Sequence, residues 1–132
     1  MIGIVIVAHG GLAREYVAAV EHVVGELPSL RAISISPEDD RDTKQREICT
    51  AANAVDSGSG VVVVTDLFGG SPSNLSLQAC APSNRRILYG ANLPLLIKLA
   101  KTRHLPVADA VRQAMEAGKK YINSQNISPE AE

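Results

Sequence analysis

The chain has 132 residues, which is enough for one domain with a hydrophobic core and too few for two ordinary domains. Its formal net charge of −1 argues against a nucleic-acid binder that works by neutralising phosphates. No apolar run is long enough to span a membrane, and no basic segment precedes the first apolar run as in a signal peptide. We therefore expect a cytoplasmic protein without direct membrane insertion.

The distribution of charge and the spacing of the cysteines bear on possible partners and on disulfide or metal chemistry. Residues 1–66 carry 5 Lys/Arg and 10 Asp/Glu, whereas residues 67–132 carry 8 and 4. This asymmetry is either the chance segregation of solvated faces or a polar docking surface for another protein. Cys49 and Cys80 fit neither a C-x-x-C motif nor metal-ligand spacing, so we interpret them as small, reduced core residues.

Apolar runs alternate with helical patterns along the chain. In chain order, the patterns predict a strand over residues 2–8, a helix from Leu12 to Gly25, a strand over 30–35, a helix capped by Asp40 or Asp42 and ending near Val55, a strand over 61–66, a helix from Pro72 to about Cys80, a strand over 86–89, a helix from Pro94 to about Thr102, and a helix from near Pro106 to about Asn123. This order predicts an α/β fold in three layers, with a mainly parallel central sheet of four strands and helices on both faces. We expect one domain over residues 1–123. The polar tail, 124–132, is either disordered or adds an antiparallel edge strand.

The stretch from Val61 to Asn74 has the strongest local signals. Four consecutive valines predict a strand that is covered on both faces, as in a parallel sheet. Gly69-Gly70 allows a sharp turn, and Ser71 is a natural N-cap with Pro72 at the first helical position. Free N–H groups at this turn favour an anion.

Three unusual segments follow predicted strands: His9-Gly10, Asp66 through Ser71, and Gly90-Ala91-Asn92. In parallel sheets, ligands gather outside the carboxyl ends of the strands, so these segments are expected to meet there. A carboxylate that accepts the proton of one histidine ring nitrogen leaves the other nitrogen as a nucleophile or a metal ligand.

The histidine at this edge is a core residue, a metal ligand or a nucleophile. The other histidines, His22 and His104, have no matching spacing, which argues against a metal site. A serine nucleophile is also disfavoured, because Gly-Gly-Ser-Pro-Ser is not the G-x-S-x-G elbow and the proline after Ser71 lacks an oxyanion-hole N–H. A phosphoryl group carried on the imidazole of His9 best suits the nucleophilic ring nitrogen, the carboxylate that holds the ring and the N–H donors of the turn.

Three segments together carry a resemblance. They are V-A-H-G from Val7 to Gly10, D-L-F-G-G-S-P-S-N from Asp66 to Asn74, and G-A-N-L-P-L-L from Gly90 to Leu96. They resemble the signature segments of the mannose-family enzyme IIA domain of the bacterial phosphoenolpyruvate-dependent sugar phosphotransferase system. The match covers residues 1 to about 123 in register.

The resemblance implies a phosphotransferase with a phosphohistidine intermediate and neither a metal nor an organic cofactor. His9 would accept a phosphoryl group on Nε2 from the phosphocarrier protein HPr and pass it to a separate IIB protein. Asp66 would orient His9 through Nδ1–H. The resemblance implies phosphate contacts for Gly10, Gly69, Gly70 and Ser71, and partner docking for Phe68 and Asn92. It also implies a homodimer, with C-terminal segments exchanged as edge strands in the family.

Three alternatives remain open at this level. One is the phosphotransferase subunit of a dihydroxyacetone kinase system, although the residues after Asp66 depart from its usual pattern. Another is a regulatory phosphoprotein of an incomplete phosphotransferase system, which uses the same chemistry with a different acceptor. The last is a small-ligand-binding module in which His9 and Asp66 form only a buried hydrogen-bonded pair. The sugar is not determined by the sequence.

Overall fold

The computed structural model describes residues 1–67, 69–77, 81–82 and 84–128. Its strands form one parallel sheet in the order β2-β1-β3-β4. The strands are β1 (Gly3–His9), β2 (Leu30–Ile35), β3 (Val61–Thr65) and β4 (Arg85–Tyr89). The helices are α1 (Leu12–Val24), α2 (Arg41–Val55), α3 (Ser71–Ser76), α4 (Leu93–Lys101) and α5 (Val107–Lys120). The predicted α/β class with helices on both faces is confirmed.

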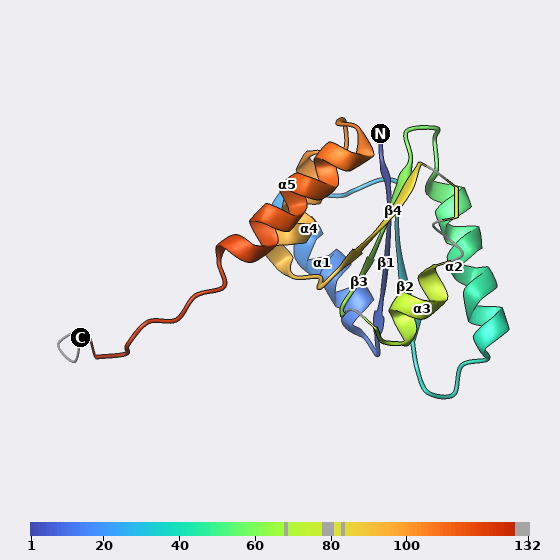
Figure 1. Cartoon of the computed structure of the whole chain (residues 1–132), viewed down its shortest axis with the longest axis horizontal. Coiled ribbons are helices and arrows are strands. Elements are labelled where there is room, and N and C mark those ends of the chain that lie inside the picture. The colour runs from blue at the N-terminus through green and yellow to red at the C-terminus, as the bar shows by residue number, and fades with distance from the viewer. Residues whose placement is uncertain (68, 78–80, 83, 129–132) are drawn as a thin grey trace.

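The sheet lies between two helical layers. Figure 1 shows α1, α4 and α5 on one side of the sheet and α2 and α3 on the other. Along β1, Ile4 and Ile6 pack into the core under the first layer, and Val5 and Val7 into the core under the second. Side chains of a strand alternate between faces, so a strand with both faces covered must be apolar throughout. This arrangement explains the continuous valine run of β3, which is fully buried.

Several helix boundaries differ from the prediction by one to a few residues. Gly70, not Ser71, is the N-cap of α3, so Ser71 is the first helical residue and Pro72 the second. The extended backbone of Gly70 (ψ 178°) delays the turn into the helix until after that residue. At the other end of the domain, α5 ends at Lys120, three residues before the predicted end at Asn123. The last predicted residues of the helix after β3, 78–80, lie outside the described chain.

The C-terminal tail forms no strand in residues 122–128, the part of it that the structure describes. It runs away from the body of the domain (Figure 1), and Ile127 is fully exposed. Thus residues 124–128 add no edge strand within this single chain, which was one of the two alternatives for the tail. The described helices are also each too short or too polar to cross a membrane.

Cys49 lies on α2 as a free thiol, half-buried against the core under α2 and α3. This matches the expected reduced cysteine, at the margin of the core and not in its centre. The other predicted core cysteine, Cys80, lies outside the described residues.

Arg103 joins the segments that precede β1 and β2 to the segment after α4. It is 4 % exposed, and its guanidinium donates to the carbonyls of Ile2 (2.7 Å), Pro28 (2.7 Å) and Ser29 (2.9 Å). Burial lowers the pKa of this guanidinium. The fork of five N–H donors is what allows one side chain to satisfy three backbone carbonyls.

Replacing Arg103 with methionine should lower the free energy of unfolding by about 3 kcal/mol, because three backbone carbonyls lose charge-assisted donors. Urea denaturation measures the change. Arg112→Met is the matched control, since Arg112 is 61 % exposed and, among the described residues, its ion pair is with Asp109 one helix turn away. An equal loss in both variants would contradict the anchoring role of Arg103.

Candidate functional site

The carboxyl ends of β1 and β3 bring a histidine and an aspartate together. These strands are neighbours, with Val7 opposite Thr65, so the residues that follow meet at one edge. His9 Nδ1 lies 2.8 Å from Asp66 Oδ2, and the same oxygen accepts the His9 backbone N–H at 3.0 Å. The predicted contact between the two side chains is therefore present.

The environment of Asp66 fixes the state of the histidine. The carboxylate is 8 % exposed, and burial pushes its pKa up, but the hydrogen bonds from the backbone and ring of His9 outweigh this and hold the pKa below its usual value. Asp66 is thus ionised at neutral pH and only accepts hydrogen bonds. It follows that Nδ1 of the neutral imidazole carries the hydrogen and Nε2 carries the lone pair.

The far side of the imidazole is open. The His9 side chain is 47 % exposed, and within the described part of the chain Nε2 has no hydrogen-bond partner. A nitrogen with a lone pair on a half-exposed ring, oriented by a carboxylate, is the arrangement that nucleophilic catalysis requires.

The turn after β3 lies against this ring. A Cβ added to Gly70 would be 3.4 Å from His9 Cε1, and Gly69 adopts φ +85°, a region that favours glycine. Ser71 follows with an exposed side chain, and the N-cap of α3 is Gly70, which has no side chain to cap the helix. This turn therefore places small residues beside the exposed ring.

Gly10 is held by the end of β2. Its N–H donates to the Ile35 carbonyl at 2.9 Å, and its own carbonyl accepts a hydrogen bond from Ser34 Oγ. A phosphate contact through this N–H would require that the bond to Ile35 break. The predicted phosphate-binding role of Gly10 stays a prediction.

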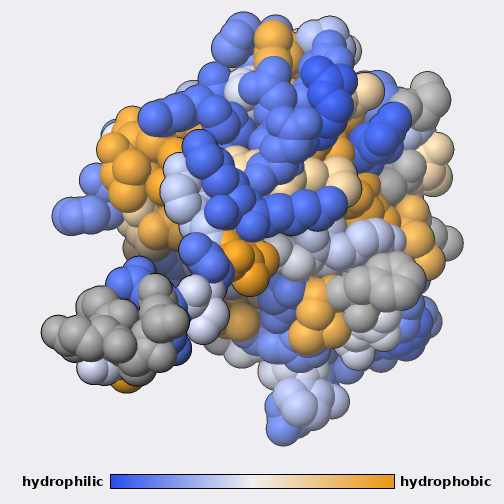
Figure 2. All heavy atoms as spheres, turned by 60° about the vertical axis from the view of Figure 1, so that its left-hand side comes forward, coloured by the Kyte–Doolittle hydropathy of each residue, from blue (hydrophilic) through white to orange (hydrophobic). Residues whose placement is uncertain are grey.

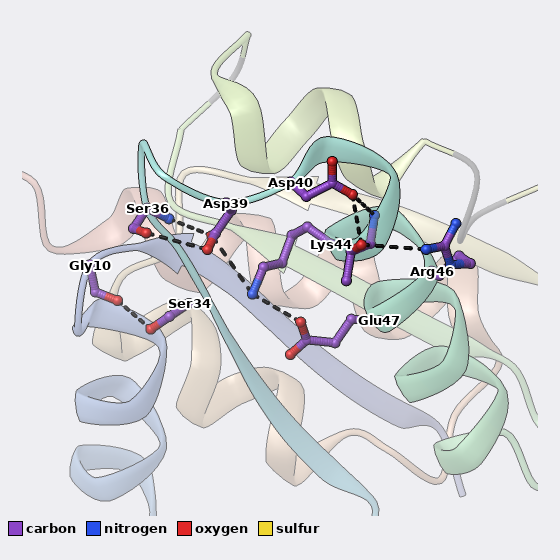
Figure 3. A network of polar contacts seen from close by, with 9 residues as sticks. Gly10, Ser34, Ser36, Asp39, Asp40, Lys44, Arg46 and Glu47 are labelled. Atoms are coloured by element: carbon purple, nitrogen blue, oxygen red, sulfur yellow. Dashed lines mark hydrogen bonds and ion pairs between the residues drawn. The ribbon is translucent and has the colours of Figure 1, made fainter.

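The loop after β2 borders the Gly10 turn and is fixed by its own acidic residues (Figure 3). Asp39 accepts the Ser36 N–H at 2.7 Å, and Asp40 caps α2 by accepting the Thr43 N–H at 2.9 Å. Hydrogen bonds from the Thr43 hydroxyl and N–H lower the pKa of Asp40. Of the two predicted caps for this helix, Asp40 is the one used.

The two residues expected to dock partners have different outcomes. Asn92 Oδ1 accepts the Leu95 N–H at 3.0 Å, and Asn92 Nδ2 donates to the Gly118 carbonyl at 2.9 Å. Asn92 thus caps α4 and joins it to α5, and its docking role stays a prediction. Phe68 lies outside the described residues.

Tyr16 is a residue near the site that the sequence did not single out. Its ring packs against the core under α1, and its hydroxyl donates to the Ala91 carbonyl at 3.1 Å. Burial, and secondly the negative charge of Asp66, raise the pKa of this hydroxyl. The signal in the sequence was a tyrosine, which has a polar tip, on an otherwise apolar helix face directly after His9.

Among the described residues, no three His, Cys, Asp or Glu side chains are grouped closely enough to hold a metal ion. Part of the excess positive charge of the C-terminal half lines shallow hollows on the outer side of α4 and α5, where Figure 2 shows hydrophilic side chains around small hydrophobic patches. The basic residues of these hollows are Lys98, Lys101, Arg112 and Lys120.

Known proteins share this fold and about a quarter of this sequence. The sorbose-specific EIIA component of Lacticaseibacillus casei is 26 % identical over 92 % of this chain and 88 % of its own length. A putative phosphotransferase enzyme IIA component of Escherichia coli K12, YadI, is 29 % identical over 94 % of this chain and 86 % of its own. Among solved structures, the mannose/sorbose-specific IIA subunit from Enterococcus faecalis superposes with a TM-score of 0.85 at 23 % identity, covering 96 % of each chain.

A family model described as "PTS system fructose IIA component" matches residues 3–116. The matched range contains His9, Asp66 and the turn between β3 and α3. Because the match covers most of the chain, this protein belongs to the fructose- and mannose-type IIA components of the phosphotransferase system, a family of phosphotransferase proteins.

Proposed function

We propose that this protein is a phosphocarrier of a sugar phosphotransferase system and that His9 carries the phosphoryl group on Nε2. The 2.8 Å contact between His9 Nδ1 and the ionised Asp66 is the observation that supports this most directly. It fixes the tautomer, and the exposed half of the ring leaves room for a phosphoryl donor.

The chemistry is a transfer between two imidazoles. The Nε2 lone pair of His9 attacks the phosphorus of a phosphohistidine donor, forming one N–P bond while the donor's N–P bond breaks. The donor imidazole leaves with the electron pair of that bond. Nδ1 of His9 keeps its hydrogen, and the positive charge that develops on the ring is stabilised by the Asp66 carboxylate.

The phosphoryl oxygens are proposed to lie beside the turn after β3. The backbone N–H groups of Gly69 and Gly70 and the Ser71 hydroxyl are the donors in this proposal. Its support is that Gly70 lies against the His9 ring and that the Ser71 side chain is exposed.

The partners in this proposal are HPr as donor and a IIB protein as acceptor. The mannose-specific EIIAB component of E. coli, which is 24 % identical and of which this chain covers 41 %, is a relative whose name joins A and B components. A homodimer is also part of the proposal. The exposed apolar side chains of Ile122 and Ile127 after α5 are consistent with a contact between subunits.

Incubation with phosphoenolpyruvate, enzyme I and HPr tests the proposal. We expect acid-labile, base-stable labelling that maps to His9. Absence of label, or label on another residue, would refute it. Adding candidate IIB proteins to the labelled protein then identifies the acceptor, since a carrier in transport should pass on its label.

Replacing Gly70 with alanine should slow phosphoryl transfer about three- to tenfold, because the new methyl fills space in contact with the His9 ring, 3.4 Å from Cε1, and crowds Leu67 Cδ1, 3.0 Å away. Initial rates of labelling by phospho-HPr measure this. Gly11→Ala adds the same methyl where nothing lies within 4 Å, and it should transfer at the wild-type rate. Equal rates in the two variants would show that Gly70 does not limit the space around His9.

A further inference from the structure

Within the described residues, the side-chain contacts of the Asp66 carboxylate are uneven. Its Oδ2 accepts both hydrogen bonds from His9, whereas Oδ1 is buried and has no hydrogen-bond partner in that part of the chain. In a carboxylate that orients a catalytic histidine, the second oxygen would ordinarily be fixed by another donor. Here the position of the carboxylate must depend on the backbone from which it projects.

That backbone is anchored across the sheet by the β4–α4 loop. The Ala91 N–H donates to the carbonyl of Thr65 at 3.0 Å, and Thr65 directly precedes Asp66. The Ala91 carbonyl in turn accepts the Tyr16 hydroxyl at 3.1 Å. Tyr16 lies on the second turn of α1, the helix that begins three residues after His9.

These contacts form a closed circuit through β1, α1, the β4–α4 loop and the end of β3. The chain runs from His9 into α1, the Tyr16 hydroxyl joins α1 to Ala91, Ala91 joins the end of β3, and Asp66 returns to His9. Ala91 is only 9 % exposed, so water has little access to its carbonyl, and within the described chain Tyr16 is the donor that satisfies it. A buried carbonyl without its donor would drive the loop to rearrange.

We propose that Tyr16 is a positioning residue for phosphoryl transfer, which holds Asp66 against His9 through the Ala91 carbonyl and the end of β3. This inference rests on the proposed phosphocarrier function and adds a residue to its machinery. Tyr16 acts through the backbone and does not touch the phosphoryl group. The charge of Asp66, which contributes to the raised pKa of the Tyr16 hydroxyl, is consistent with their proximity.

Tyr16→Phe tests the proposal, because it removes the hydroxyl and keeps the ring that packs in the core under α1 and α4. The initial rate of labelling by phospho-HPr should fall about tenfold. Long-range nitrogen–proton NMR at about pH 8.5, where an imidazole is neutral, should show His9 changing from a single Nδ1–H tautomer to a mixture. Tyr121→Phe removes the same hydroxyl from a side chain that is 66 % exposed and should change neither readout.

The outcomes separate positioning from simple stability. Lower thermal stability in Tyr16→Phe with a wild-type transfer rate and a single His9 tautomer would overturn the proposal. The tautomer measurement needs no phosphoryl donor. If wild-type protein takes up no label, the phosphocarrier function fails, while the NMR comparison still decides whether Tyr16 positions the pair.

Discussion

Replacing His9 with alanine should abolish phosphoryl labelling and leave the fold nearly unchanged. The loss should be complete, because Nε2 of this ring is the proposed nucleophile and alanine has no atom that can accept the phosphoryl group. The fold should survive because the ring lies at the end of β1 and is 47 % exposed, so its removal leaves no cavity in the core. Labelling by phospho-HPr and circular dichroism measure the two effects.

The other histidines provide matched controls for this variant. His22, in α1, and His104, after α4, are both exposed, and neither pairs with a carboxylate among the described residues. His22→Ala and His104→Ala should therefore label as wild type. If His9→Ala keeps some label, and this label disappears when His22→Ala or His104→Ala is added to the same protein, the phosphoryl group belongs to that other histidine.

Replacing Asp66 with asparagine should slow phosphoryl transfer by about 10²- to 10⁴-fold without preventing folding. The amide has nearly the shape of the carboxylate but no charge, so it stabilises the positive charge on the phosphorylated ring less well. It can also donate to Nδ1, which would place the hydrogen on Nε2 and remove the nucleophilic lone pair. Single-turnover transfer from phospho-HPr measures the rate.

Two observations distinguish this explanation from general damage to the site. Asp109→Asn removes a charge from an exposed carboxylate on α5 whose ion pair, within the part of the chain that the structure describes, is with Arg112, and it should transfer at the wild-type rate. In Asp66→Asn, NMR should detect the His9 tautomer with hydrogen on Nε2. Wild-type transfer in Asp66→Asn would mean that the carboxylate does not set the reactive state of the ring.

Local pattern predicted most elements of the fold because local and tertiary preferences agree in this chain. Leu30–Ile35 is a strand with the predicted bounds, and Asp40 begins α2 as one of the two expected caps. One failure lies where two local signals compete. Both Gly70 and Ser71 suit the N-cap of α3, and only the path of the turn beside His9 decides between them.

Contacts between distant segments were beyond the sequence. The bond of Asn92 to the Gly118 carbonyl depends on how α4 packs against α5, and the engagement of the Gly10 N–H by Ile35 depends on the register of β1 against β2. Neither packing nor register between segments far apart in the chain is encoded by a local pattern. For this reason, two residues predicted for ligands or partners were found in structural hydrogen bonds.

By itself, the sequence determined that a histidine and an aspartate follow two buried strands, because apolar runs ending in polar residues locate strand ends without any knowledge of the fold. The tertiary structure decided that those strands are neighbours, which sets the 2.8 Å contact between the two side chains. It also decided that Tyr16 reaches Ala91 from a helix that sequence alone describes only as amphipathic. Such hydrogen bonds depend on how helices pack on the sheet, and packing is settled only when the whole chain is folded.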